Sequence, residues 1–194
     1  MPPAPRWAQT GTAVLVVDGL LARDATLRDR TATQLLGPGD VVDPWATGED
    51  LLACDVSWFV HEPTTLAALG GRFAMATRRW PQLALNVQRR LSSRADRLAG
   101  QAAALQLPNV DQRVVAVLWQ LADRFGRIVP DGIVIPLRLS HQVIGRLVGA
   151  QRPTVTLALG KLAAAGAVVR REDGSWLLSA DSREAVLPHA ALAG

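Results

Sequence analysis

The chain has 194 residues, of which 49% are hydrophobic, enough to bury the core of one large domain or two small ones. Its single cysteine, Cys54, excludes an intrachain disulfide and a cysteine-only metal or iron–sulfur site, and we expect it to be a small buried residue. The N-terminus does not resemble a signal peptide, and no apolar run reaches the roughly 18 residues of a membrane span. We therefore expect a cytoplasmic protein that does not bind membranes.

Charge is divided unevenly along the chain. Residues 1–80 hold 7 Arg against 9 acids, whereas residues 81–194 hold 14 basic residues against 8 acids. No acid lies between Asp131 and Glu172, and that window carries Arg138, Arg146, Arg152, Lys161, Arg170 and Arg171. A basic window of one sign is typical of a surface that binds a polyanion, although a solvated basic face would have the same composition.

Residues 1–80 have the pattern of a small all-β unit followed by one short helix. The pair Asp18-Gly19 between two apolar runs predicts a hairpin, and Gly-Pro-Gly-Asp at 37–40 predicts a second turn. The segments VSWFV and TTLAAL are further β-rich pieces, bounded by Pro63 and Gly70. RFAMATRRW then predicts a helix that ends before Pro81.

Residues 82–105 form one long predicted helix with a narrow apolar seam. Apolar residues recur in steps of three and four, at Val87, Leu91, Ala95, Leu98, Ala102 and Leu105. A seam of this kind between two domains most simply packs on its own copy in a parallel two-fold dimer, so these six residues are the candidate dimer interface. The alternative is that the seam packs on the chain's own β unit.

Beyond Pro108 the predicted order is helix, strand, helix, turn, helix, hairpin, which is that of a winged helix-turn-helix. The first helix is NVDQRVVAVLWQLADRF, with Asn109 or Asp111 placed to cap it and Gly126 at its C-terminal end. GIVIPLRL is a short extended segment. The hairpin is AVVRREDGSWLL, which turns at Asp173-Gly174.

The two helices between these segments carry the functional signal. Ser140 can cap HQVIGRLV, and RPTVTLALGKLAAA is the second helix. Gly145 supplies the small residue needed where the helices touch, and Gly149 can adopt the left-handed backbone of the turn. The residues expected to point into the shared core are Ile144, Val148, Ala150, Val155 and Ala158.

Residues 108–179, and LSHQVIGRLVGAQRPTVTLALGKLAAAGAVVRREDGSWLL above all, resemble the DNA-binding domain of the Crp/Fnr family of bacterial transcription regulators. VLVVDGLLAR and QLLGPGDVV resemble pieces of that family's cyclic-nucleotide-binding β-roll. The resemblance implies an α+β fold with a shortened β-roll at 1–80, a dimerisation helix at 81–107 and a winged helix-turn-helix at 108–194. It also implies a homodimeric, sequence-specific regulator of transcription that binds a palindromic DNA site.

The family places the second helix in the major groove of DNA. Arg152 falls on the family's base-contacting Arg, whose partner would be guanine. Pro153 stands where Glu is common and Leu157 where Arg is common, so we expect a different target sequence, with apolar contact to a thymine methyl as one option. The candidate DNA-binding residues are Ser140, His141, Gln151, Arg152, Pro153, Thr154, Thr156, Arg170 and Arg171.

The β-roll departs from the family where its ligand would bind. The family uses an Arg to neutralise a cyclic phosphate, but no Lys or Arg lies between Arg30 and Arg72, and LLACD occupies the corresponding place. We expect that cyclic AMP does not bind in the usual way, and we assign no cofactor. Two interpretations stay open: a roll that only supports the dimer, or a pocket for a less charged ligand lined by Trp45 and Trp58, two residues that equally suit a core.

The expected partners are double-stranded DNA and a second copy of the chain, with RNA polymerase as a further candidate. A different class of function is a protein-interaction scaffold whose winged domain does not read DNA; binding to duplex DNA that weakens steeply with salt would separate the two. We expect no enzyme, because the sequence has no Ser-His-Asp set, metal-ligand cluster or phosphate loop.

Overall fold

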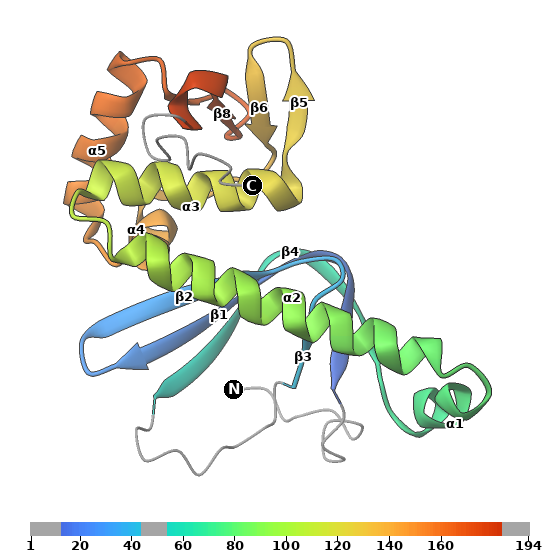
Figure 1. Ribbon diagram of the computed structural model, residues 1–194. Coiled ribbons are helices and arrows are strands. Elements are labelled where there is room, and N and C mark those ends of the chain that lie inside the picture. Colours follow the sequence, from blue (N-terminus) through green and yellow to red (C-terminus); the bar gives the residue numbers. More distant parts are fainter. Residues whose placement is uncertain (1–12, 44–53, 184–194) are drawn as a thin grey trace, which may run out of the picture. The chain divides into compact units, whose positions relative to one another are not determined.

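The computed structural model describes residues 13–43 and 54–183 (Figure 1). Its contacts divide the chain into two compact units, with the division between Asp96 and Arg97. This division falls inside the long helix α2 (Gln82–Leu105). Strands dominate the first unit and helices the second, so the expected α+β fold is confirmed. No helix among the described residues is long and apolar enough to cross a membrane.

The first unit is built on one antiparallel sheet. Its strands are β1 (Val14–Leu27), β2 (Arg30–Leu36), β3 (Val41–Val42) and β4 (Asp55–Ala68). β1 pairs with β2 and β3 along one edge and with β4 along the other. Its core consists of Val14, Val16, Leu21, Leu36 and Val42, with Trp58 packed against them. Trp58 is therefore a half-buried residue packed against this core, while Trp45 lies outside the described residues.

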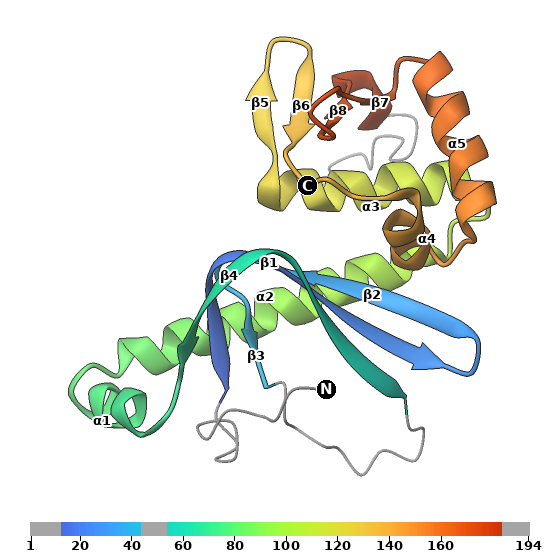
Figure 2. The same ribbon diagram turned by 180° about the vertical axis from the view of Figure 1, so that it is seen from behind.

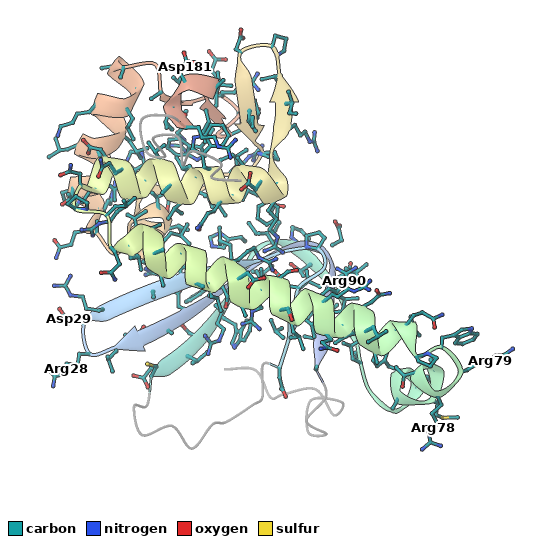
Figure 3. All side chains as sticks on the ribbon, in the orientation of Figure 1. Arg28, Asp29, Arg78, Arg79, Arg90 and Asp181 are labelled. Atoms are coloured by element: carbon teal, nitrogen blue, oxygen red, sulfur yellow. The ribbon has the colours of Figure 1, made fainter. Side chains whose placement is uncertain are left out.

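The predicted hairpin at Asp18-Gly19 is wrong. β1 runs through both residues, and its pairing with β4 shifts register around them. Gly19 has a φ of +87°, and a Cβ there would meet the carbonyl oxygen of Pro63. Gly19 thus lies in a bulge of a continuous strand. The pairing of β1 with β4 before and after the bulge outweighs the local turn signal. The actual hairpin turns at Arg28, whose φ is 56°, and Figure 3 shows Arg28 and Asp29 at its tip.

The predicted turn at 37–40 is confirmed. Gly39 has a φ of +92°, and the Asp40 carboxylate accepts a hydrogen bond of 3.0 Å from the Gly37 backbone N–H. The strand that follows the turn, β3, pairs with β1 and not with β2. The turn therefore returns the chain to the central strand.

β4 is one strand of 14 residues, although Pro63 had predicted two pieces. Among the described residues β4 pairs only with β1, so its second edge needs no N–H donor and tolerates proline. None of its 14 residues is buried. Cys54, directly before it, is exposed, which corrects the expectation of a buried cysteine: it leads into a strand that itself has no buried position.

The helices of the first unit follow the prediction. α1 (Gly71–Arg79) ends before Pro81, and Figure 3 shows Arg78 and Arg79 extending from it. The first part of α2 contacts the sheet through arginines: Arg90 donates to the Gly39 carbonyl (3.1 Å), and Arg94 donates to the Val41 carbonyl (3.2 Å). The side of α2 that meets this sheet is therefore polar.

The second unit contains three helices next to a four-stranded antiparallel sheet of order β5-β6-β8-β7 (Figures 1 and 2). Its elements are α3 (Val110–Phe125), β5 (Arg127–Val129), β6 (Gly132–Ile135), α4 (His141–Val148), α5 (Arg152–Ala164), β7 (Val168–Arg170), β8 (Trp176–Leu178) and the 3-10 helix η2 (Ala180–Arg183). The largest fully buried side chains of this unit include Trp176, Leu118, Ile135, Ile144 and Leu178. They come from α3, α4 and the sheet, which share one core.

Two details of this unit differ from the prediction. β5 was not predicted, since three residues are too few to show a strand pattern. Gly126 ends α3 in an extended conformation, with a φ of −68°, instead of a left-handed one. A small residue is nevertheless needed there, because a Cβ would meet the carbonyl oxygen of Ala122. Asn109 occupies the N-cap position of α3, but its side chain makes no capping hydrogen bond.

We predict that Gly19→Ala destabilises the protein by at least about 2 kcal/mol, because alanine would be strained at this φ and would collide with Pro63. Gly71→Ala is the matched control: no atom lies within 4 Å of its added Cβ, and we expect a change within about 0.5 kcal/mol. Urea unfolding at one fixed protein concentration measures both. Equal stabilities of the two variants would contradict the role given to Gly19.

Candidate nucleic-acid interface

The turn between α4 and α5 has the predicted helix-turn-helix geometry. The Ser140 hydroxyl caps α4 by accepting from the Val143 backbone N–H at 3.3 Å. Gly149 ends α4 with φ 65° and ψ 33°, the left-handed conformation that favours glycine. The Ala150 N–H then donates to the Gly145 carbonyl at 2.9 Å, which closes the turn. The expectations for Ser140 and Gly149 are confirmed.

Gly145 lies where the chain after the turn passes closest to α4. A Cβ at Gly145 would lie 2.5 Å from the Ala150 carbonyl oxygen, so any larger residue would push the turn away. The predicted inward-facing residues are buried except Ala150, which is half-buried; the fully buried ones are Ile144, Val148, Val155 and Ala158. This packing fixes the direction in which α5 leaves the turn.

α5 has one buried and one exposed face. Val155, Ala158 and Leu159 are buried, whereas the residues on the other side of its N-terminal half are exposed: Arg152, Pro153, Thr154, Thr156 and Leu157. Gln151 is the N-cap residue, and Pro153 lies in the first turn. A proline is tolerated there because a backbone N–H in the first turn has no helical acceptor to lose.

His141 and Thr156 connect the starts of the two helices. His141 Nδ1 lies 2.9 Å from the Thr156 hydroxyl, which donates its proton to the Arg152 carbonyl at 3.0 Å. Since a threonine hydroxyl has one proton to donate, this pairing places the His141 proton on Nδ1. The contact joins residues 15 positions apart, and no sequence pattern indicated it. It ties the first turn of α5 to the first turn of α4.

The pKa of His141 is lowered by its surroundings. Partial burial disfavours the charged ring, and the positive charges of Arg170 and Arg152 add to the effect. The ring also lies 6.2 Å from the buried indole of Trp176, measured between ring centroids. His141 is therefore a neutral link between α4, α5 and the hairpin at neutral pH.

The β7–β8 hairpin forms the wing. The Arg170 guanidinium lies over the Trp176 ring at 5.7 Å from its centroid, and Arg171 is exposed at the start of the turn. The Asp173 carboxylate accepts from the backbone N–H and the hydroxyl of Ser175, at 2.9 and 2.6 Å. These hydrogen bonds lower the pKa of Asp173, and the positive charges of Arg171 and Arg138 lower it further by a smaller amount. The acid thus shapes the turn that presents the arginines.

A basic cleft lies beside the wing, and the sequence had not indicated it as a site. Its charged lining consists of Arg127 from β5, Arg138 from the segment before α4, and Arg171 with Asp173 from the wing turn. The aliphatic stem of Arg138 lies against Gly174 of that turn. Arg138 belongs to the acid-free window, but Arg127 joins the cluster only because β5 pairs with β6. Three cations against one carboxylate suit an anionic ligand.

The predicted dimer seam on α2 is largely exposed in the single chain. Leu91 and Leu98 are 45% and 42% exposed, Ala95 and Ala102 are also exposed, and Val87 and Leu105 are half-buried. The one buried residue of α2 is Ala104, which lies off the seam. An apolar stripe of this kind is available for a partner.

Among the described residues no three His, Cys, Asp or Glu side chains come together in a way that could hold a metal ion. The segment in which the family's phosphate-binding residues would fall lies mostly within residues 44–53, outside the described part of the chain. No cofactor can be assigned from the side chains that remain.

Comparison with known proteins agrees with this geometry. Residues 112–182 match the family model of the Crp-like helix-turn-helix domain. The chain superimposes on a CRP-family transcriptional regulator of Thermus thermophilus with a TM-score of 0.70 and 23% identity, covering 95% of this chain and 91% of the other. The resemblance to the Crp/Fnr family is confirmed: the chain has the fold of these regulators, and residues 112–182 form a Crp-like helix-turn-helix domain.

Two curated transcription regulators are similar to part of this chain in sequence. A global nitrogen regulator of Synechocystis is 39% identical over 87 residues, which are 45% of this chain and 39% of the relative. A CRP-like cAMP-activated global transcriptional regulator of Mycobacterium tuberculosis is 34% identical over 111 residues, 55% of this chain and 49% of the relative. The matched part thus spans less than half the length of each relative.

We predict that the lowered pKa of His141 makes folding stability depend on pH. Below its ordinary value of 6.5 the ring binds a proton more readily in the unfolded chain than in the folded one, so stability should fall as the pH drops from about 7.5 to about 5.5. His141→Gln should reduce that fall. The control His61→Gln, on exposed β4, should leave it unchanged. Urea unfolding at the two pH values measures this; an equal fall in wild type and His141→Gln would contradict it.

Proposed function

We propose that this protein is a sequence-specific, DNA-binding transcription regulator that acts in the cytoplasm as a homodimer on a palindromic site. The observation that carries the proposal is the presentation of α5. Its inner face is buried in a Crp-like helix-turn-helix domain, while the outer face of its N-terminal half, including Arg152, is exposed. A recognition helix needs both properties, because it must be held rigidly and must leave its outer side chains free for base edges.

The exposed groups have separate roles in this proposal. Arg152 makes a bidentate contact with guanine in the major groove, and Gln151 and Thr154 contact neighbouring phosphates or base edges. The start of α4, at Ser140 and His141, faces the DNA backbone. Arg170 and Arg171 follow the backbone from the wing, and the basic cleft beside the wing extends the same positive surface.

The position of Thr156 changes one expectation. Its hydroxyl is engaged by His141 and the Arg152 carbonyl. We therefore propose that Thr156 fixes the start of α5 and does not itself read a base. Arg152 then provides the main polar contact to the bases.

We predict that the purified protein selects a palindrome with guanine in each half-site from a random duplex library. Arg152→Ala should weaken binding to that site at least ten-fold, as expected when a bidentate contact worth about 1–3 kcal/mol is lost. Arg78→Ala, on α1, removes an equally exposed arginine from the other unit (Figure 3) and should leave affinity unchanged. Gel-shift titration at two salt concentrations measures the effects.

Failure to enrich any duplex would overturn the DNA-binding proposal. It would favour the alternative, a scaffold whose winged domain binds protein. Enrichment that does not depend on Arg152 would overturn only the role given to this residue.

The proposed dimer rests on α2. Its exposed apolar stripe includes Leu91 and Leu98, and the side of α2 that meets the sheet is occupied by Arg90 and Arg94. This distribution supports association with a second copy over packing of the seam on the chain's own sheet. Two copies related by a two-fold axis would present two α5 helices to two half-sites.

We predict that Leu98→Asp converts the dimer to a monomer and weakens operator binding, because it places a charge in the apolar seam. Met75→Asp is the matched control, since Met75 is 72% exposed on α1, outside the seam. Light scattering coupled to gel filtration gives the mass of each variant. A wild-type monomer, or a Leu98→Asp variant that remains dimeric, would contradict the proposed interface.

We further infer that cyclic AMP does not bind in the usual way. The M. tuberculosis relative is named as cAMP-activated, yet this chain has no Lys or Arg between Arg30 and Arg72 to balance a cyclic phosphate. A phosphodiester enclosed without a cation would be strongly disfavoured. RNA polymerase as a further partner remains a prediction from the family resemblance.

A further inference from the structure

Leu157 is an unusual residue on the exposed face of α5. Its side chain is 70% exposed, although Val155, Ala158 and Leu159 around it are buried. It lies one helical turn after Pro153, so the two side chains share a face, next to the face that carries Arg152. A large aliphatic side chain therefore stands in the middle of the surface proposed to enter the major groove.

The polar side chain directly before Leu157 is already engaged within the protein. The Thr156 hydroxyl is held by His141 and the Arg152 carbonyl. One turn further along, Gly160 has no atom within 4 Å of the place where a Cβ would be, so nothing covers the helix there. Leu157 thus follows an engaged hydroxyl directly and precedes, by three residues, a position with open space.

The charge around Leu157 indicates what covers it. Arg152 on α5 and Arg170 on the wing both lie close enough to His141 to act on its charge, Arg171 is exposed beside Arg170, and the window from 132 to 171 has no acid. A protein partner with an apolar patch would gain nothing from these cations, whereas duplex DNA is complementary to them. The major groove of DNA displays one kind of apolar group, the C5-methyl of thymine.

We propose that Leu157, supported by the ring of Pro153, binds the C5-methyl group of a thymine in each half-site. This inference rests on the proposed DNA-binding function and names the base that the apolar part of α5 selects. Leucine has no donor or acceptor, so it discriminates by burying the methyl group and by leaving the amino group of a cytosine unpaired. Arg152 and Leu157 then select different bases, the first by hydrogen bonds and the second by apolar contact.

The test removes only the methyl group. Each thymine of the selected operator is replaced in turn by deoxyuridine, which keeps every hydrogen-bonding group. We expect one thymine per half-site at which the change weakens binding about four-fold, and more than about ten-fold when both half-sites are changed, as expected from the burial of one methyl group. Fluorescence anisotropy titration measures the affinities.

The variants assign the effect to Leu157. Leu157→Ala should bind thymine and deoxyuridine operators equally at that position, while Arg152→Ala should keep the thymine preference at reduced affinity. Ile128→Ala is the matched control: it also removes an exposed aliphatic side chain, 88% exposed on β5, and should change neither affinity nor preference. Replacing the critical thymine–adenine pair by 5-methylcytosine–guanine should bind better than cytosine–guanine, because the methyl group is restored.

Leu157→Arg provides a gain-of-function version of the test. If Leu157 faces a base edge, arginine there should shift the preferred base from thymine toward guanine in a repeated selection. A folded variant with an unchanged preferred site would contradict the proposed placement of residue 157.

The outcomes separate this inference from the proposed function. If no duplex is enriched, the DNA-binding function itself fails. If an operator is found but deoxyuridine is tolerated at every thymine, or if Leu157→Ala retains the sensitivity, the protein binds DNA and the methyl contact is wrong.

Discussion

The close approach of the chain at Ala150 to Gly145 is the constraint on which the rest of the candidate site depends. With no Cβ at Gly145, the Ala150 carbonyl passes close to α4 and α5 begins at a fixed angle. Gly149 makes the turn possible through its positive φ. Val148 and Val155 then fill the angle between the helices from inside. Every property ascribed to Arg152 or Leu157 presupposes this arrangement, because it decides which side of α5 faces outward.

A second contact, between His141 and Thr156, adds to the constraint that the approach of Ala150 to Gly145 places on α5. The packing of the apolar residues sets the direction of α5, whereas this hydrogen bond fixes its first turn at the outer surface. It also engages the hydroxyl of Thr156, which lies on the exposed face of α5. The exposed surface at the start of α5 therefore presents a cationic group, Arg152, and an aliphatic one, Leu157, beside the polar side chains of Gln151 and Thr154.

Sequence periodicity predicted the helices well and the sheet poorly. The bounds of α2 and α4 agree with prediction because their residues repeat at helical spacing and end at clear signals such as Pro108 and Gly149. β1 was misjudged because Gly19 was interpreted as a turn from its neighbours, whereas pairing with the distant strand β4 makes it a bulge. Local pattern carries no information about such distant pairing. The role of Arg127 in the cleft was missed for the same reason.

Among the described residues one edge of β4 has no partner strand, and this edge bears on the behaviour of the protein at high concentration. An unpaired strand edge with exposed apolar residues, such as Phe59 and Val60, can recruit a strand from another molecule and so start aggregation. Pro63 interrupts the row of donors along this edge, and Glu62 places a charge beside the interruption. Pro63, which led the sequence pattern to predict two strands, thus limits aggregation, because it shortens the stretch of β4 that can pair with a strand of another molecule.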